Sequence, residues 1–207
     1  MKFVLFVEGH TEKKALPDFL KRWLDPQLSQ PVRIKIVRFE GWKEYVKDIK
    51  KKVALHLTGQ TGADVIAAIG LLDLYGPTFY PTAKTDAESR RAWAKEYLET
   101  LVGDDRFRQH FAVHELEAWL LASAGLPNAV RNALPGRCTQ PEGINFDEPP
   151  AKLLERLYRE KLKRNYKKTT DGTDLFRKLE PEAAQARCPY LKALLDDMLR
   201  FAKAVGL

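Results

Sequence analysis

The sequence predicts an α/β protein with an open, mostly parallel sheet flanked by helices and a helical extension at the C-terminal end. Short apolar runs alternate with amphipathic segments of helical period over residues 1–125. Because parallel strands cannot be joined by a hairpin, this alternation is typical of strands connected by helical crossovers. A hydrophobic fraction of 44% and a charged fraction of 30% are close to those of average globular domains and argue against a disordered or fibrous chain.

The first strand and the first helix are expected at the beginning of the chain. An apolar run at residues 1–7 predicts a buried strand that ends in a turn at Gly9. Apolar residues then recur at helical spacing between Leu16 and Leu24, with Thr11 as the expected N-cap. The pair Asp25-Pro26 is expected to end this helix, because the residue before a proline disfavours helical geometry.

Two further strands and a second helix follow. Val32–Phe39 alternates apolar and basic residues, which predicts a strand with one solvated face near an edge of the sheet. Residues 42–53 carry an apolar stripe opposite a lysine-rich side and predict an amphipathic helix. After a turn at residues 58–62, the unbroken apolar run Val65–Leu72 predicts a central strand that ends at Asp73.

The remainder of the chain changes from alternating elements to helices. Residues 87–102 have a helical pattern, and residues 107–114 predict a fourth strand. Several prolines and little periodicity follow, which is typical of an irregular segment. The sequence therefore predicts an α/β domain at residues 1–125, an irregular connection at 126–150 and a helical C-terminal extension at 151–207 that packs on the same unit.

The candidate catalytic and metal-binding residues stand at the ends of the predicted strands. Ligands of open parallel sheets bind outside the carboxyl ends of the strands. Glu8 follows the first strand, with Glu12 one helical turn later, and Asp73 ends the third strand. Like charges gathered at one edge repel one another unless a cation neutralises them, and oxygen ligands favour Mg²⁺ or Mn²⁺. The predicted metal ligands are Glu8, Glu12, Asp73, Glu115 and Glu117.

Other roles stay open for several of these side chains. Acids near helix starts commonly cap the helix or interact with its dipole, which applies to Glu8, Glu12 and Glu115. A surface position facing elsewhere is equally compatible with Glu117. His114, at the end of the fourth strand, is a candidate acid, base or phosphate donor and equally a structural histidine. The candidate catalytic residues are Glu8, Asp73, His114 and Glu115.

The net charge of +7 is concentrated in two stretches of the chain. Residues 152–168 hold eight basic and two acidic side chains, and residues 33–52 hold eight basic and three acidic ones. Four bases of the first stretch recur at helical spacing, a pattern that suits a phosphate backbone. A solvated helix face explains either stretch equally well. The candidate nucleic-acid-binding residues are Lys152, Arg156, Arg159, Lys163, Lys167 and Lys168.

Three motifs give the chain a family resemblance. They are Phe6-Val7-Glu8-Gly9-His10-Thr11-Glu12, Asp73-Leu74-Tyr75-Gly76 and His114-Glu115-Leu116-Glu117-Ala118-Trp119-Leu120-Leu121. The first resembles the Val-Glu-Gly-x-Thr-Glu signature of Toprim domains, the α/β catalytic unit of topoisomerases, primases and the overcoming-lysogenisation-defect (OLD) nucleases. In their order along the chain, the motifs resemble a bacterial Toprim-like family known as domain of unknown function 4276.

This resemblance implies metal-dependent phosphoryl transfer, with Glu8 as the catalytic glutamate and Asp73 as a magnesium ligand. Glu12 and Glu115 would be further ligands or acid/base residues. Toprim enzymes usually have Asp-x-Asp where this chain has a tyrosine, Tyr75, in place of the second acid, so the pattern for two-metal chemistry is incomplete. Relatives of this kind often accompany an ATPase in phage defence, and an ATPase partner is therefore expected by analogy.

The function that we expect from the sequence is a cytoplasmic, Toprim-like hydrolase that uses Mg²⁺ or Mn²⁺ to cut nucleic-acid phosphodiesters. The alternative is a Toprim-like fold without catalysis, acting as a nucleic-acid-binding or nucleotide-binding subunit of an ATPase complex. A weaker third hypothesis is a structural adaptor whose charge only confers solubility. No membrane association is expected, because no stretch approaches the ~18 apolar residues of a membrane helix. Cys138 and Cys188 are expected to be buried free thiols.

Overall fold

The computed structural model describes residues 1–143 and 148–207, apart from the side chains of residues 10, 11 and 61. Its centre is a four-stranded sheet with the order β2-β1-β3-β4, in which each pair of neighbours is parallel. The predicted α/β class and parallel sheet are therefore confirmed. The strands are β1 (Lys2–Val7), β2 (Arg33–Arg38), β3 (Val65–Asp73) and β4 (Phe107–Ala112).

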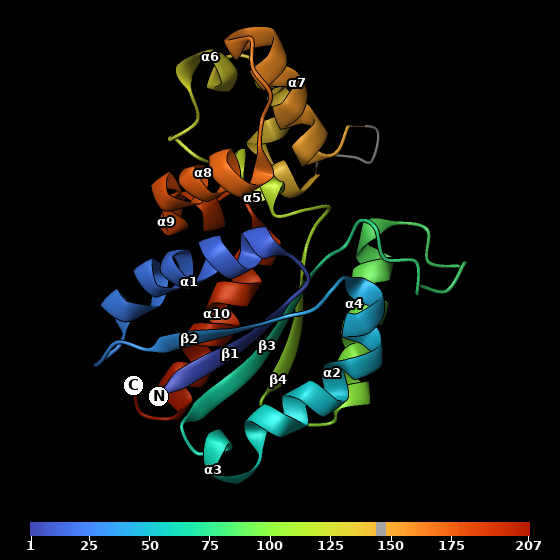
Figure 1. The fold of residues 1–207 in the computed structure, drawn as a ribbon, viewed down its shortest axis with the longest axis vertical. Coiled ribbons are helices and arrows are strands. Elements are labelled where there is room, and N and C mark those ends of the chain that lie inside the picture. The colour runs from blue at the N-terminus through green and yellow to red at the C-terminus, as the bar shows by residue number, and fades with distance from the viewer. Residues whose placement is uncertain (144–147) are drawn as a thin grey trace.

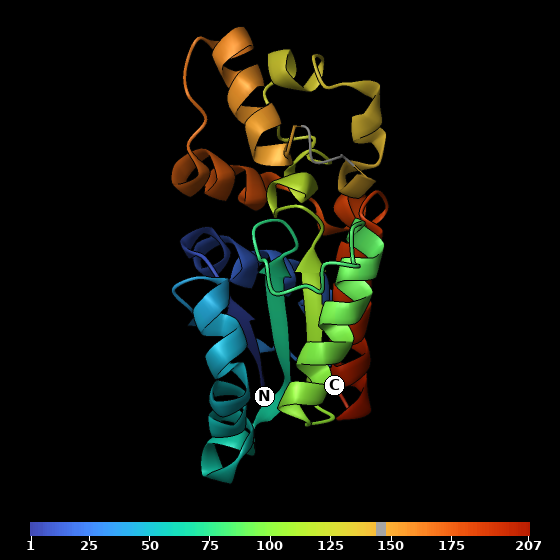
Figure 2. The same cartoon turned by 90° about the vertical axis from the view of Figure 1, so that its right-hand side faces the viewer.

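Helices cover both faces of this sheet (Figures 1 and 2). One face packs against α1 (His10–Leu24) and α10 (Pro189–Ala204), and the other against α2 (Trp42–Leu57) and α4 (Ala87–Val102). The side chains of β1 alternate accordingly, with Leu5 in the first core and Phe6 in the second. The sheet is therefore the middle layer of three, with a hydrophobic core on each side.

The path of the chain explains why a C-terminal helix belongs to the sheet. From β1 the chain moves outward to β2 through α1, and it then returns past β1 to β3 through α2 and continues to β4 through α4. Right-handed crossovers in opposite directions place α1 on one face and the other two helices on the opposite face. These connections leave the α1 face of β3 and β4 uncovered, and α10 packs there.

A helical lobe lies beyond the carboxyl ends of the strands (Figure 1). One continuous hydrophobic cluster joins it to the sheet, including Leu5, Trp119, Leu154 and Phe176. This cluster has members on both sides of the predicted domain boundary at residue 125. The elements of the lobe are α5 (Glu117–Leu120), α6 (Asn128–Arg131), η2 (Gly136–Thr139), η3 (Pro141–Gly143), α7 (Pro150–Leu162), the π-helical turn η4 (Lys168–Gly172), α8 (Thr173–Lys178) and α9 (Pro181–Gln185). Two further short elements lie outside the lobe, η1 (Asp25–Gln27) and α3 (Gly59–Gly62).

Most elements lie where the sequence predicts them, and β2 is an edge strand as expected. The start of α1 differs, because the helix begins at His10 with Gly9 as its N-cap, so Thr11 lies inside the helix. Only Glu8 and Gly9 separate β1 from α1. Cys138 and Cys188 are buried free thiols, as predicted. Within the described residues, no helix is both long enough and apolar enough to cross a membrane.

Gly70, in the centre of β3, makes room for a buried hydrogen bond. Tyr45 Oη of α2 donates to Gln109 Oε1 of β4 at 2.6 Å, and a Cβ at Gly70 would overlap both atoms. We predict that Gly70→Ala lowers the free energy of unfolding by about 2–5 kcal/mol, because it overpacks the core and breaks this bond. Urea unfolding followed by circular dichroism measures the change.

Gly136→Ala is the matched control for this substitution. A Cβ at Gly136 would meet no described atom within 4 Å, so this variant should change the free energy of unfolding by less than about 1 kcal/mol. Equal unfolding midpoints for the two variants would contradict the close packing described around Gly70.

Candidate functional site

An acidic pocket lies at the carboxyl ends of β1 and β3. The crossovers change direction between these two strands, and such switch points are where open α/β sheets bind ligands. The pocket has a volume of about 210 Å³. Four carboxylates and one ammonium group share it, and its lining residues are Glu8, Gly9, Glu12, Asp73, Leu116, Glu117 and Lys168.

The short turn between β1 and α1 brings Glu8 and Glu12 together. Glu8 directly follows β1, and Glu12 lies in the first turn of α1. A Cβ at Gly9 would overlap the carboxylate of Glu12, so the glycine lets this side chain fold back over the end of the strand. Both predicted ligands from the first motif therefore line the same pocket.

Burial of these acids makes it unfavourable for all of them to be ionised at once. Burial is the main cause that raises the pKa of Asp73 well above its usual range, and the charges of Glu12 and Glu117 raise it further. Burial also raises the pKa of Glu8, although a hydrogen bond from the backbone N–H of Trp42 opposes this. The pKa of Glu12 is raised by burial and by the charge of Glu8. A cation in the pocket would relieve this repulsion.

The chain turns sharply after β4 and enters the pocket. His114 has a φ of 66°, in the left-handed region, and its carbonyl accepts a hydrogen bond from the Tyr75 N–H at 3.2 Å. Glu117 follows this turn, is only 4% exposed and lines the pocket, so it does not face solvent elsewhere. The His114 side chain is buried, does not line the pocket, and has its pKa lowered by burial, which favours the neutral imidazole.

Lys168 places a positive charge among the acids. Its Nζ lies 3.4 Å from Glu117 Oε1 and 3.8 Å from Glu115 Oε2. Burial disfavours the charged form of Lys168, but attraction to Glu117, Glu115 and Asp73 outweighs burial and raises its pKa. Glu115 Oε2 also accepts a hydrogen bond from the Ala151 N–H at 3.1 Å, so this acid caps α7 as well as contacting Lys168.

A clamp between Arg164 and Asp171 holds the segment that carries Lys168. Arg164 donates through both terminal nitrogens to the two oxygens of Asp171, at 2.9 and 2.8 Å. The backbone N–H of Lys167 donates to the same carboxylate at 2.8 Å. These bonds close the loop between α7 and η4. They place Lys168, the first residue of η4, at the carboxyl ends of the strands.

The predicted nucleic-acid-binding residues on α7 extend away from the pocket. α7 begins beside Glu115 and leads away over its 13 residues, about 20 Å at 1.5 Å per residue (Figure 1). Lys152 pairs with Glu155 at 2.9 Å, and Arg156 pairs with Glu148 at 2.6 Å. Only Lys168 of the six reaches the acids. The remaining three residues are exposed: Arg159, Lys163 and Lys167.

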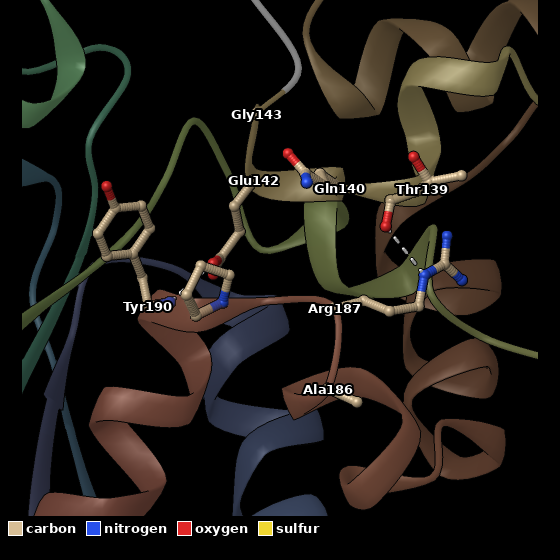
Figure 3. Close-up of a pocket in the computed structure, with 8 residues that line it drawn as sticks. Thr139, Gln140, Glu142, Gly143, Ala186, Arg187 and Tyr190 are labelled. Atoms are coloured by element: carbon tan, nitrogen blue, oxygen red, sulfur yellow. Dashed lines mark hydrogen bonds between the residues drawn. The ribbon is translucent and has the colours of Figure 1, made fainter.

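A larger cavity, of about 640 Å³, lies where the helical lobe meets the start of α10 (Figure 3). The Glu142 carboxylate in this cavity accepts hydrogen bonds from Trp119 Nε1 at 3.0 Å and from the Tyr190 N–H at 2.7 Å. Arg187 donates to the carbonyl oxygen of Thr139 at 3.3 Å. Because the fold already uses these polar groups, the acidic pocket is the stronger candidate for chemistry.

The donors of the acidic pocket are chemically suited to a hard divalent cation. All four are carboxylates, the ligand type that Mg²⁺ and Mn²⁺ prefer, and burial is the main cause that raises the pKa of each of them. In the described parts of the chain, however, no three Asp, Glu, His or Cys side chains are already arranged to hold a metal ion. Binding one would require the carboxylates to draw together and Lys168 to move.

Sequence reasoning missed two features of this site. It assigned Lys168 to a phosphate-binding stripe and did not predict its contact with the acids. No regular sequence spacing relates the segment that carries Lys168 to the segments that carry the acids. It also passed over Tyr166, whose buried hydroxyl has no hydrogen-bond partner within the described residues. Burial, and then the charge of Glu117, raises the pKa of Tyr166. Tyr75, at the position of the second Toprim acid, is exposed and does not line the pocket.

One protein-family model matches this chain. Its description is "Domain of unknown function (DUF4276)", and the match covers residues 7–199. The matched range includes all four pocket carboxylates and Lys168. Neither a curated protein nor a solved structure was found to match.

Ionised Asp73 is expected to lower the stability of the fold. The pKa of Asp73 is 3.8 in an ordinary environment, as in the unfolded chain, and it is raised in the folded protein. At a pH between 3.8 and the raised pKa, the folded protein therefore keeps a proton on Asp73 that the unfolded chain has released. Stability should therefore fall as the pH rises from about 4 through the raised pKa, and stay reduced above it. We predict that Asp73→Asn raises Tm at pH 8 in EDTA, by about 2–4 °C for each kcal/mol regained.

Asp64→Asn serves as the control for this measurement. A hydrogen bond from Lys2 lowers the pKa of Asp64, so its ionised form is favoured in the folded state. This control should show an unchanged or lower Tm at pH 8. If Asp73→Asn melted below the wild-type protein at pH 8, the repulsion described for the pocket would be wrong.

Proposed function

This chain is a member of the DUF4276 family, and we propose that it is a metal-dependent phosphodiesterase of Toprim type that cuts nucleic acid. The observation that carries the proposal is the acidic pocket, in which carboxylates from the ends of three strands meet at the switch point of the sheet. The resemblance of the Glu8 and Asp73 motifs to those of Toprim domains supports the same assignment. A relationship to the OLD nucleases is part of this proposal.

The pocket residues have distinct roles in this proposal. Glu8, Glu12, Asp73 and Glu117 would hold Mg²⁺ or Mn²⁺, which when bound polarises a phosphate and lowers the pKa of a water molecule. The backbone N–H of Trp42 holds the Glu8 carboxylate, which we propose as the general base.

Lys168 is the candidate phosphate-binding group of the pocket. Its side chain is 43% exposed although its ammonium group lies beside two acids, so a non-bridging phosphate oxygen can approach it from solvent. Because Tyr75 supplies no second acid, we propose a one-metal site in which Lys168 neutralises part of the phosphate charge.

The basic side chains along α7 support nucleic acid as the substrate. α7 begins beside Glu115 and carries Lys152, Arg156 and Arg159 outward along one helix, as a protein that contacts successive phosphates requires. A role in phage defence with an ATPase partner is proposed by analogy to relatives of this kind.

A second candidate function is a nucleic-acid-binding or nucleotide-binding subunit without catalysis. The contact between Lys168 and Glu117, at 3.4 Å, favours it, because the protein then supplies its own cation to the acidic cluster. In this case the pocket would bind a divalent metal weakly or not at all.

Cleavage assays test the hydrolase directly. Single-stranded and double-stranded DNA and RNA would each be incubated with Mg²⁺, Mn²⁺ or EDTA. We expect metal-dependent cleavage, and a rate reduced by about 10²–10⁴-fold in Glu8→Gln and Asp73→Asn, because each removes a group from the reacting centre. Asp64→Asn, remote from the pocket, should retain full activity. Cleavage that survives both pocket substitutions would refute the assignment.

Calorimetric titration with Mn²⁺ separates the two candidate functions. We predict that Lys168→Gln binds Mn²⁺ about tenfold more tightly than the wild-type protein, because it removes a repulsion of about 1.4 kcal/mol or more between the ammonium group and the metal. Lys167→Gln, which alters the exposed neighbour, should leave the affinity unchanged. Failure of all three proteins to bind Mn²⁺ would favour the subunit without catalysis.

A further inference from the structure

We propose that the substrate of this site is single-stranded, and that its bases stack on an aromatic surface beside the acidic pocket. This inference rests on the proposed function and adds the substrate class to it. The aromatic surface consists of Trp42, Phe79, Tyr80, Trp93 and Tyr97.

Trp42 and Tyr80 connect the aromatic surface to residues at the acidic pocket. Trp42 is the first residue of α2, and its backbone N–H donates to the Glu8 carboxylate. Tyr80 Oη donates at 3.1 Å to the carbonyl oxygen of Leu74, which directly follows β3. The loop that carries Phe79 and Tyr80 lies between the upper ends of the adjacent helices α2 and α4 (Figure 2). A strand whose phosphate enters the pocket therefore places its neighbouring nucleotides against these rings.

The rings form one connected group rather than scattered surface residues. The Phe79 centroid lies 5.9 Å from that of Trp42, 4.7 Å from that of Tyr80 and 6.0 Å from that of Trp93. Trp93 and Tyr97 stack at 5.0 Å with an angle of 8° between their planes. Tyr97 is 39% exposed, and with Trp93 it lines a hollow of about 370 Å³. This group offers flat ring surface to an aromatic ligand.

The charges around the rings favour a nucleic acid over a protein partner. Lys43 Nζ lies 5.7 Å from the Trp42 ring centroid, and the Arg90 guanidinium lies 5.6 Å from that of Tyr80. Aromatic rings accompanied by cations are the combination with which proteins bind single strands, whereas an apolar protein surface would desolvate these charges. Glu96 also lines the hollow, so we place the phosphates on the side of Lys43 and Arg90.

The ring surface also selects between single and double strands. Bases in a duplex are stacked on each other and present only their edges in the grooves, so they cannot lie flat on a protein ring without being flipped out. Bases of a single strand offer their faces freely, and each base that stacks on an aromatic side chain contributes about 1–3 kcal/mol. The aromatic surface is therefore suited to a single strand that leads into the pocket.

Intrinsic fluorescence provides the test, because Trp42 and Trp93 are partly exposed whereas Trp23 and Trp119 are buried. Oligo(dT) of about 12 nucleotides and a duplex of the same length would be titrated in EDTA, where metal-dependent cleavage does not occur. We expect oligo(dT) to quench the emission and the duplex to bind at least about tenfold more weakly. Tyr97→Leu should weaken oligo(dT) binding by roughly 5- to 150-fold, and Tyr97→Phe should retain it.

Leu55→Ala is the matched control, because Leu55 is 69% exposed near the other end of α2 and should not affect binding. The inference would be overturned if the duplex bound as tightly as oligo(dT), or if Tyr97→Leu bound oligo(dT) with wild-type affinity. Metal-dependent cleavage of a duplex would still support the proposed hydrolase in that case. Ring-dependent binding of oligo(dT) without cleavage under any metal would support the aromatic surface and contradict the hydrolase. Failure to bind any oligonucleotide would overturn the inference.

Discussion

Four carboxylates packed at the carboxyl ends of β1 and β3 repel one another, and much of the surrounding structure holds them in place. Burial raises the pKa of Asp73, so this group resists ionisation beside the other acids. The backbone N–H of Trp42 stabilises Glu8, and the ammonium group of Lys168 lies 3.4 Å from Glu117. Such a site is expected to lower the stability of the fold, a trade-off common at functional sites.

The C-terminal helical segment contributes to the core and to the site. Crossover handedness leaves part of one sheet face uncovered, and α10 packs on it. Before reaching α10, the same segment passes the ends of the strands, where the clamp between Arg164 and Asp171 directs Lys168 into the acidic pocket. The extension is therefore part of the α/β unit, because without it the sheet would expose apolar surface and the acids would lack their cation.

The unequal charge distribution has a spatial counterpart in the structure. Both basic stretches pass close to the acidic pocket, because α2 starts beside Glu8 and α7 starts beside Glu115. The aromatic surface lies next to the first of them, with Lys43 over one of its rings. An acidic centre with cations and flat rings around it supports the proposal that a nucleic-acid strand approaches from solvent while a divalent cation neutralises the centre.

The sequence alone determined the strands, most helices and the placement of Glu8 and Asp73 at strand ends, because apolar periodicity and strand termini are local properties of the chain. It left open whether Glu117 is buried and which helix each acid caps, and it did not relate Lys168 to the acids. Tertiary structure decided these points: Glu115 caps α7, which lies 36 residues further along the chain, and Lys168 reaches the pocket through a loop closed by an ion pair. The tertiary structure alone also decided the strand order and brought together the aromatic rings of α2, of α4 and of the loop between β3 and α4. Each depends on contacts between distant segments, for which packing and crossover handedness, rather than local spacing, supply the constraint.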